Sequence, residues 1–112
     1  DRILGLLSTI TMPNLSKTLA KSRQRLAKTN LQMILNAQKL YRAGRDSFYR
    51  PESGNITRDL TEINRALNLD IEDRYFDYEL EYKSPSDFQA RAVSKTDNSV
   101  SYKIGPQGFI DD

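Results

Sequence analysis

The stretch NLSKTLAKSRQRLAKTNLQMILNAQKLYRA, residues 14–43 of a 112-residue chain, decides the fold. At 3.6 residues per turn, it predicts a helix with an apolar stripe roughly 60° wide along one side. The stripe consists of Leu15, Leu19, Leu26, Met33, Ala37 and Leu40. Basic side chains gather on the opposite side, namely Lys17, Lys21, Arg25, Lys28, Lys39 and Arg42. We expect the stripe to form a core or packing seam and Gly44 to end the helix.

Three further apolar side chains of this helix, Leu31, Ile34 and Leu35, lie outside the stripe. A helix that is apolar on most sides is normally covered on two of them. At about 1.5 Å per residue the helix is roughly 45 Å long, which exceeds the diameter of a globule of this size. We therefore expect part of it to protrude from the fold.

The segment that follows the helix predicts a loop and a short second helix. Residues 44–56 contain two glycines, a proline and other turn formers, and Phe48 and Tyr49 are expected to fix this loop to the core. Thr57 or Asp59 can serve as the N-cap of the second helix. Its apolar face consists of Leu60, Ile63, Ala66 and Leu67.

The C-terminal part changes to the two-residue period of strands. In FDYELEY, residues 76–82, apolar and acidic side chains alternate, and residues 88–92 and 100–104 repeat the pattern more weakly. Turn residues separate the three runs, so the simplest topology is an antiparallel meander. On its outer face, Glu79 and Glu81 are expected opposite Arg91 or Lys103.

These elements predict one α+β domain, in which a long N-terminal helix packs on a small, three- to four-stranded antiparallel sheet with a short helix in the connecting loop. The helix comprises residues 1–43, with an apolar assembly segment at 3–12 and a basic amphipathic segment at 14–43, and residues 44–112 form a globular head. Residues 1–45 carry nine Lys or Arg and one acid, whereas 46–112 carry eight bases and fourteen acids. This asymmetry favours contact with nucleic acid, anionic lipid or the acidic part of another copy.

The chain contains no histidine and no cysteine. The commonest metal ligands and the usual general base and nucleophile pairs are therefore missing, so we expect no enzyme activity and no cofactor. The acidic residues between 70 and 77 fit no standard calcium loop, and we interpret them as solvated rather than metal-binding.

The N-terminal strip from Ile3 to Met12 carries no charge. It is shorter than the roughly 20 residues needed to cross a bilayer, so it is expected to be a truncated membrane segment or an assembly surface. Pro13 removes a helix hydrogen bond and predicts a kink or an unwound turn at that point.

The first forty residues resemble the N-terminal region of type IV pilins and type II secretion pseudopilins. The resemblance rests on the spacing of Gly5 and Pro13, the basic stretch after them, and an Ala-Gln…Tyr segment at Ala37, Gln38 and Tyr41. YFDYELEY and, near the end, YKIGPQGF agree more loosely.

This resemblance implies a structural filament subunit of a pilus or pseudopilus in a bacterial cell envelope. Its partners are copies of itself in a helical filament, related minor pilins and an inner-membrane assembly platform. Family members begin with a longer hydrophobic run containing a glutamate, whereas this chain begins at Asp1-Arg2, so we interpret it as N-terminally truncated. The residues that the resemblance assigns to filament packing are Ile3, Leu4, Gly5, Leu6, Leu7, Ile10, Met12 and Pro13.

A nucleic-acid-binding module, including a pilin used for DNA uptake, is the alternative. It relies on the basic residues Lys17, Lys21, Arg25 and Lys28. Aromatic side chains beside these cations favour this alternative, because bases stack on aromatic rings. None occurs in the first 40 residues, which favours the filament.

Overall fold

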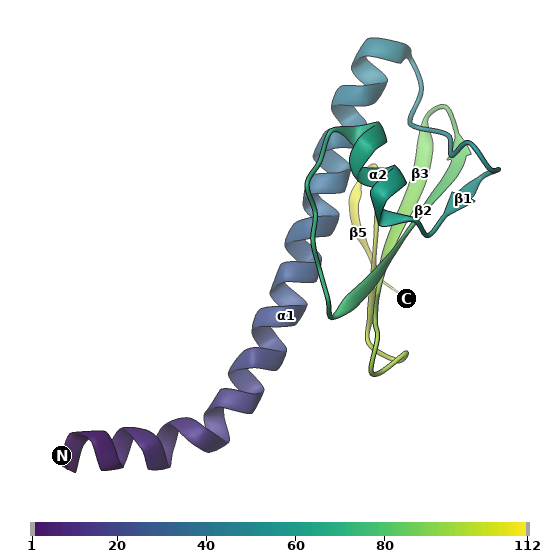
Figure 1. Cartoon of the computed structure of the whole chain (residues 1–112). Helices are drawn as coiled ribbons and strands as arrows, with labels where there is room; N and C mark the ends of the chain where they lie inside the picture. Colours follow the sequence, from purple (N-terminus) through teal and green to yellow (C-terminus); the bar gives the residue numbers. More distant parts are fainter. Residues whose placement is uncertain (1, 112) are drawn as a thin grey trace.

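The protein consists of one long helix and a β-sheet head. The computed structural model describes the backbone of residues 2–111 and the side chains of residues 17–111. Helix α1 (Arg2–Arg45) lies against one face of the sheet and continues past it toward the N-terminus, where it bends away from the axis of the rest (Figure 1). The molecule therefore extends over 61 Å in one direction and only 26 and 24 Å in the others.

The sheet is a five-stranded antiparallel meander in the order β1-β2-β3-β4-β5. The three predicted strands are confirmed, with slightly different bounds, as β2 (Phe76–Ser84), β3 (Asp87–Ser94) and β4 (Ser101–Gly105). Two short edge strands, β1 (Ile56–Thr57) and β5 (Gly108–Ile110), raise the number above the predicted three to four.

The register of the sheet follows the charge pattern on its outer face. Glu79 lies opposite Arg91, and Arg91 lies opposite Lys103 on the next strand. Glu79 also forms an ion pair with Arg58 at 2.9 Å. The predicted pairing is confirmed for Glu79, whereas Glu81 faces Gln89 and not a cation.

The connection between α1 and the sheet follows the prediction. Helix α2 (Leu60–Leu67) begins after Asp59, whose side chain caps it by accepting a hydrogen bond from the Thr61 N–H. Phe48 and Tyr49 are buried and fix the preceding loop to the core. An antiparallel sheet, with α2 between β1 and β2 and with α1 packed on one face, makes this an α+β fold (Figure 1).

The end of α1 lies two residues beyond the predicted one. Gly44 is still helical, and the left-handed position that follows the helix is taken by Asp46, with a φ of 61°. The Asp46 N–H donates to the Arg42 carbonyl at 2.7 Å. Aspartate is among the few non-glycine residues that adopt this conformation readily, which is why glycine was not needed to end the helix.

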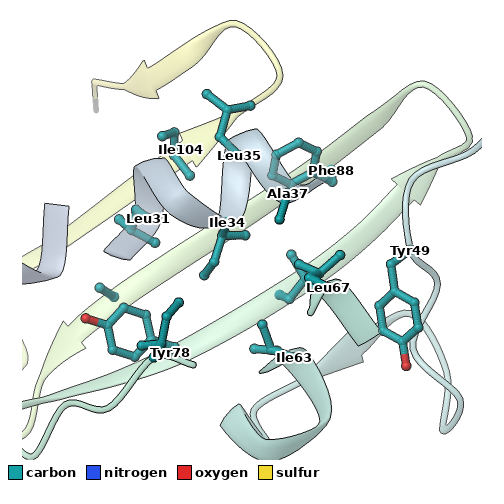
Figure 2. Close-up of a cluster of buried hydrophobic side chains, with 14 of the residues drawn as sticks. Leu31, Ile34, Leu35, Ala37, Tyr49, Ile63, Leu67, Tyr78, Phe88 and Ile104 are labelled. Carbon is teal, nitrogen blue, oxygen red and sulfur yellow. The ribbon is translucent and has the colours of Figure 1, made fainter. Parts of the chain in front are cut away.

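The buried side of α1 differs from the predicted stripe. Leu19, Leu26 and Leu40 are 43%, 41% and 77% exposed, so of the two expectations the core is wrong for these three leucines, and the packing seam stays a prediction. The side of α1 that faces the sheet carries Ala27, Asn30, Leu31, Ile34, Leu35, Ala37 and Gln38. Leu31, Ile34 and Leu35 project from α1 among side chains of the sheet and α2 in the close-up view (Figure 2).

Two hydrogen bonds explain why this side of α1 is buried. The Asn30 side-chain amide donates to the Tyr78 hydroxyl at 2.9 Å, and the Gln38 side-chain carbonyl accepts from the Tyr49 N–H at 3.0 Å. Both polar groups are buried, so a rotation of α1 that buried the leucines would break both hydrogen bonds and leave the buried Tyr49 N–H without its acceptor. The hydrophobic period alone contains no information about these partners.

Candidate functional site

A row of large apolar side chains runs along the exposed part of α1. It consists of Leu19, Leu26, Met33 and Leu40, which we call the leucine row. Positions seven residues apart drift by only about 20° around a straight helix, so the four side chains share one side. Met33 is half-buried and the three leucines are exposed. An exposed apolar row of this kind is typical of a helix that packs against another protein surface.

The C-terminal end of the leucine row lines an open groove between α1 and α2. The groove has a volume of about 480 Å³, and Met33 and Leu40 face Ala66 and Leu69 across it. Arg45 and Tyr41 also line the groove, and the Arg45 guanidinium lies 4.2 Å from the centre of the Tyr41 ring. The groove therefore extends the apolar surface of the leucine row onto the head.

An acidic segment borders the leucine row further toward the N-terminus. Leu26 shares a surface hollow with Glu72 and Asp73, which belong to the connection between α2 and β2. Asp70 and Glu72 are exposed. Arg74 and Lys95 line the same hollow, so this border of the leucine row carries charges of both signs.

The four cations predicted as a contact site, Lys17, Lys21, Arg25 and Lys28, are all exposed on α1. The structure adds aromatic groups that the sequence analysis did not associate with them. The Lys28 ammonium lies 4.8 Å from the centre of the Tyr102 ring, and both residues line a hollow of about 570 Å³ together with Phe109. Phe109 is 44% exposed.

The leucine row and these cations occupy different sides of α1. Since each residue turns a helix by about 100°, the leucine row lies roughly 110° from the buried side and roughly 140° from the centre of the cations. One side of α1 is therefore buried, a second is apolar with a border of mixed charge, and a third is basic with adjacent aromatics. Two exposed sides of different character on one helix suit contacts between unlike surfaces of two copies.

The predicted filament-packing residues, Ile3 to Pro13, lie outside the residues whose side chains are described. The backbone there belongs to α1. A bend like that in the N-terminal part of α1 is commonly caused by a proline within a helix. Within the described residues, no helix is both long and apolar enough to cross a membrane.

A buried carboxylate, Glu62 of α2, fixes the loop after α1. It accepts hydrogen bonds from the Tyr49 hydroxyl at 2.5 Å, the Thr57 hydroxyl at 2.7 Å and the Glu52 N–H at 3.2 Å. The bond from Tyr49 is the main reason why the pKa of Glu62 is lowered despite its burial. Burial and the bond to Glu62 raise the pKa of Tyr49. This cluster is structural, and no sequence pattern around Glu62 distinguishes it from a solvated acid.

Two of the acidic residues between 70 and 77, Asp73 and Asp77, have different partners and do not share a site. Asp73 accepts from the Tyr78 hydroxyl at 2.6 Å and from the N–H groups of Tyr75 and Phe76. Asp77 lies 3.7 Å from the Lys95 ammonium. Among residues 17–111, no three acidic side chains are grouped so that they could hold a metal ion.

Comparisons of the chain with protein-family models, curated proteins and solved structures found no match. The candidate site is therefore defined by its own residues, namely the leucine row and the surfaces beside it. The sequence pattern predicts the residues of the row but leaves open whether they form a core or a packing seam. The aromatics beside the basic side escaped it because β4 and β5 supply them from more than 70 positions away.

Proposed function

We propose that this protein is a structural subunit of a type IV pilus-like or pseudopilus filament that assembles through α1. The observation that carries the proposal is the leucine row, which the fold of one copy leaves exposed on a helix that extends beyond the head. Burying apolar surface contributes roughly 25 cal/mol per Å², so a row of leucines favours self-association. The resemblance of the first forty residues to pilins supports the same function.

The contact is between unlike surfaces. The leucine row faces the basic side of α1 in the next copy, where the exposed Glu72 beside Leu26 supplies an acidic partner for its cations. A contact between different surfaces of identical subunits repeats without closing unless the rotation returns to the start, which produces an open helical filament. The location of such a subunit is the bacterial cell envelope, with minor pilins and an inner-membrane platform as further partners.

A pair of matched variants tests this function. Leu26 and Ile56 are both 41% exposed, but Leu26 belongs to the leucine row and Ile56 to the edge strand β1. We expect Leu26→Gln to abolish high-molecular-weight species in sedimentation velocity and filaments in electron microscopy of the full chain. Ile56→Gln is expected to leave both unchanged. Equal assembly of the two variants contradicts the proposal.

Nucleic-acid binding is the second candidate, favoured by Tyr102 and Phe109 beside the basic side of α1. Cations bind phosphates while aromatic rings stack with bases of a single strand. A gel-shift titration of single-stranded DNA across a salt series tests it, with Lys28→Gln compared with Lys83→Gln, an exposed lysine on β2. Binding that weakens steeply with salt and depends on Lys28 alone supports it. Binding that is absent, or equally reduced in both variants, rejects it.

A further inference from the structure

A small pocket lies where α1 first meets the head. Residues 17–22 of α1 are exposed, whereas Arg23 and Gln24 are half-buried. They line a pocket of about 210 Å³ together with Arg74, just before β2, and residues 94–97 at the end of β3. Three separate segments therefore contribute polar side chains to one pocket.

Three cations surround this pocket. The Arg23 guanidinium lies 4.0 Å from the centre of the Tyr75 ring, which holds it in place without neutralising its charge. Within residues 17–111, neither Arg23 nor Arg74 has a carboxylate within ion-pair distance. Lys95 has Asp77 at 3.7 Å, but both side chains are exposed, and such pairs contribute little. Among the described residues, three cations therefore line the pocket against one carboxylate, that of Asp97.

The carboxylate that also lines the pocket, Asp97, has hydrogen-bond partners within its own turn. Asp97 accepts hydrogen bonds from the N–H and the hydroxyl of Ser99, at 3.0 and 2.6 Å. These bonds, the hydroxyl first, lower the pKa of Asp97, so it stays ionised within its own turn. The other acidic side chains near the rim are Glu72 and Asp73, which line the adjoining hollow with Arg74. Asp73 is held by Tyr78 and by the backbone.

Neutral donors complete the lining. Gln24 contributes an amide, and Thr96 contributes a hydroxyl that also contacts the Ser94 hydroxyl at 3.3 Å. Two arginines, a lysine and neutral donors are the groups that bind a phosphate, because a guanidinium donates two parallel hydrogen bonds to its oxygens. A cation would instead meet three positive charges.

We propose that this pocket binds a phosphate group, either free in solution or carried by a lipid headgroup. The bound phosphate links α1 to the segments before β2 and after β3. The proposal requires only that α1 packs on the head within one copy and does not depend on the filament function.

The first test is a calorimetric titration of the full chain with sodium phosphate at constant ionic strength. We expect saturable binding that the double substitution Arg23→Gln/Arg74→Gln weakens about tenfold or more, because charge-assisted hydrogen bonds are lost. Arg50→Gln is the matched control, since Arg50 also lies over a tyrosine ring, 5.5 Å from the centre of Tyr82, but lines none of these pockets. Its affinity for phosphate should equal that of the wild type.

The second test distinguishes the two sources of phosphate. Cosedimentation with vesicles of phosphatidylcholine, with and without phosphatidylglycerol, is compared for wild type and the double variant. Extra binding to the anionic vesicles that the double variant loses assigns the site to a lipid headgroup. Equal vesicle binding of both proteins, together with phosphate binding in the titration, assigns it to a free anion.

Two results overturn the proposal. One is the absence of saturable phosphate binding at fixed ionic strength, and the other is an equal loss in Arg50→Gln and in the double variant. Thermal unfolding verifies that the double variant is folded, and Lys95→Gln provides a second, milder variant if it is not. Assembly of these variants into filaments is a separate readout. A lack of phosphate binding therefore does not imply that filaments do not form.

Discussion

Two sides of the same helix differ in a way that the hydrophobic pattern does not predict. The buried side of α1 includes two alanines, an asparagine and a glutamine, whereas three leucines of the leucine row are exposed. The buried side is selected by specific partners, since Asn30 and Gln38 bond to the head at 2.9 and 3.0 Å. The comparison teaches that one side of a helix can pack in the core of its own molecule while an apolar row on another side stays exposed, where a second protein can cover it.

The largest expected effect is on the buried side. Ile34 is fully buried, so Ile34→Ala should lower the free energy of unfolding by about 2–5 kcal/mol through lost burial and a cavity. Urea unfolding followed by circular dichroism measures this loss. A loss below about 1 kcal/mol would mean that α1 does not pack on the sheet as described.

The next effect concerns the hydrogen bonds that orient α1. Tyr78→Phe removes the hydroxyl that accepts from Asn30 and donates to Asp73. The buried Asn30 amide would then lack its partner, at a cost of about 1–3 kcal/mol in the same unfolding assay. Tyr82→Phe is the control, since Tyr82 is only half-buried and its hydroxyl forms no hydrogen bond within the described residues. Equal stabilities of the two variants would argue against the orientation of α1.

A smaller and pH-dependent effect is expected at Glu62. Its pKa in the folded protein is lowered from the ordinary value of 4.5, so its carboxylate contributes stability that is fully present above that pH. This contribution is lost as the pH falls below 4.5 through the lowered pKa. Glu62→Gln should therefore be less stable than wild type by about 1 kcal/mol at pH 7, with the gap closing in acid. A gap independent of pH in urea unfolding would exclude the ionised carboxylate as its cause.

The smallest effect on stability is expected in the leucine row. Leu40 is 77% exposed, so Leu40→Gln should change the free energy of unfolding of the monomer by less than about 0.5 kcal/mol. Unfolding at a protein concentration too low for association measures this. A loss as large as that of Ile34→Ala would place Leu40 in the core and remove the contrast between the two sides.

The parts of the fold that depend on local pattern could be predicted from the sequence. Alternation in residues 76–82 predicted β2, and its apolar members Phe76, Tyr78 and Leu80 are buried. The strands β1 and β5 have two and three residues, too few to show a period, and exist only through pairing with β2 and β4.

The candidate site was predictable only in part. The sequence identified the leucines and the cations of α1 but not which side the sheet covers, because that depends on Tyr78, 48 positions from Asn30. The phosphate pocket escaped prediction for the same reason, since α1, the segment before β2 and the end of β3 meet only in the fold. Residues that cooperate across such separations leave no local pattern.

The central claim is that other copies of the chain cover the leucine row. Because the chain has no cysteine, Leu26→Cys and Ile56→Cys each provide a single thiol, at two sites that are equally exposed in one copy. The direct measurement is the rate of alkylation of each thiol as the protein concentration rises. We predict that the thiol at position 26 becomes about tenfold less reactive while the thiol at position 56 keeps its rate. Equal reactivity of both thiols at every concentration would contradict the claim.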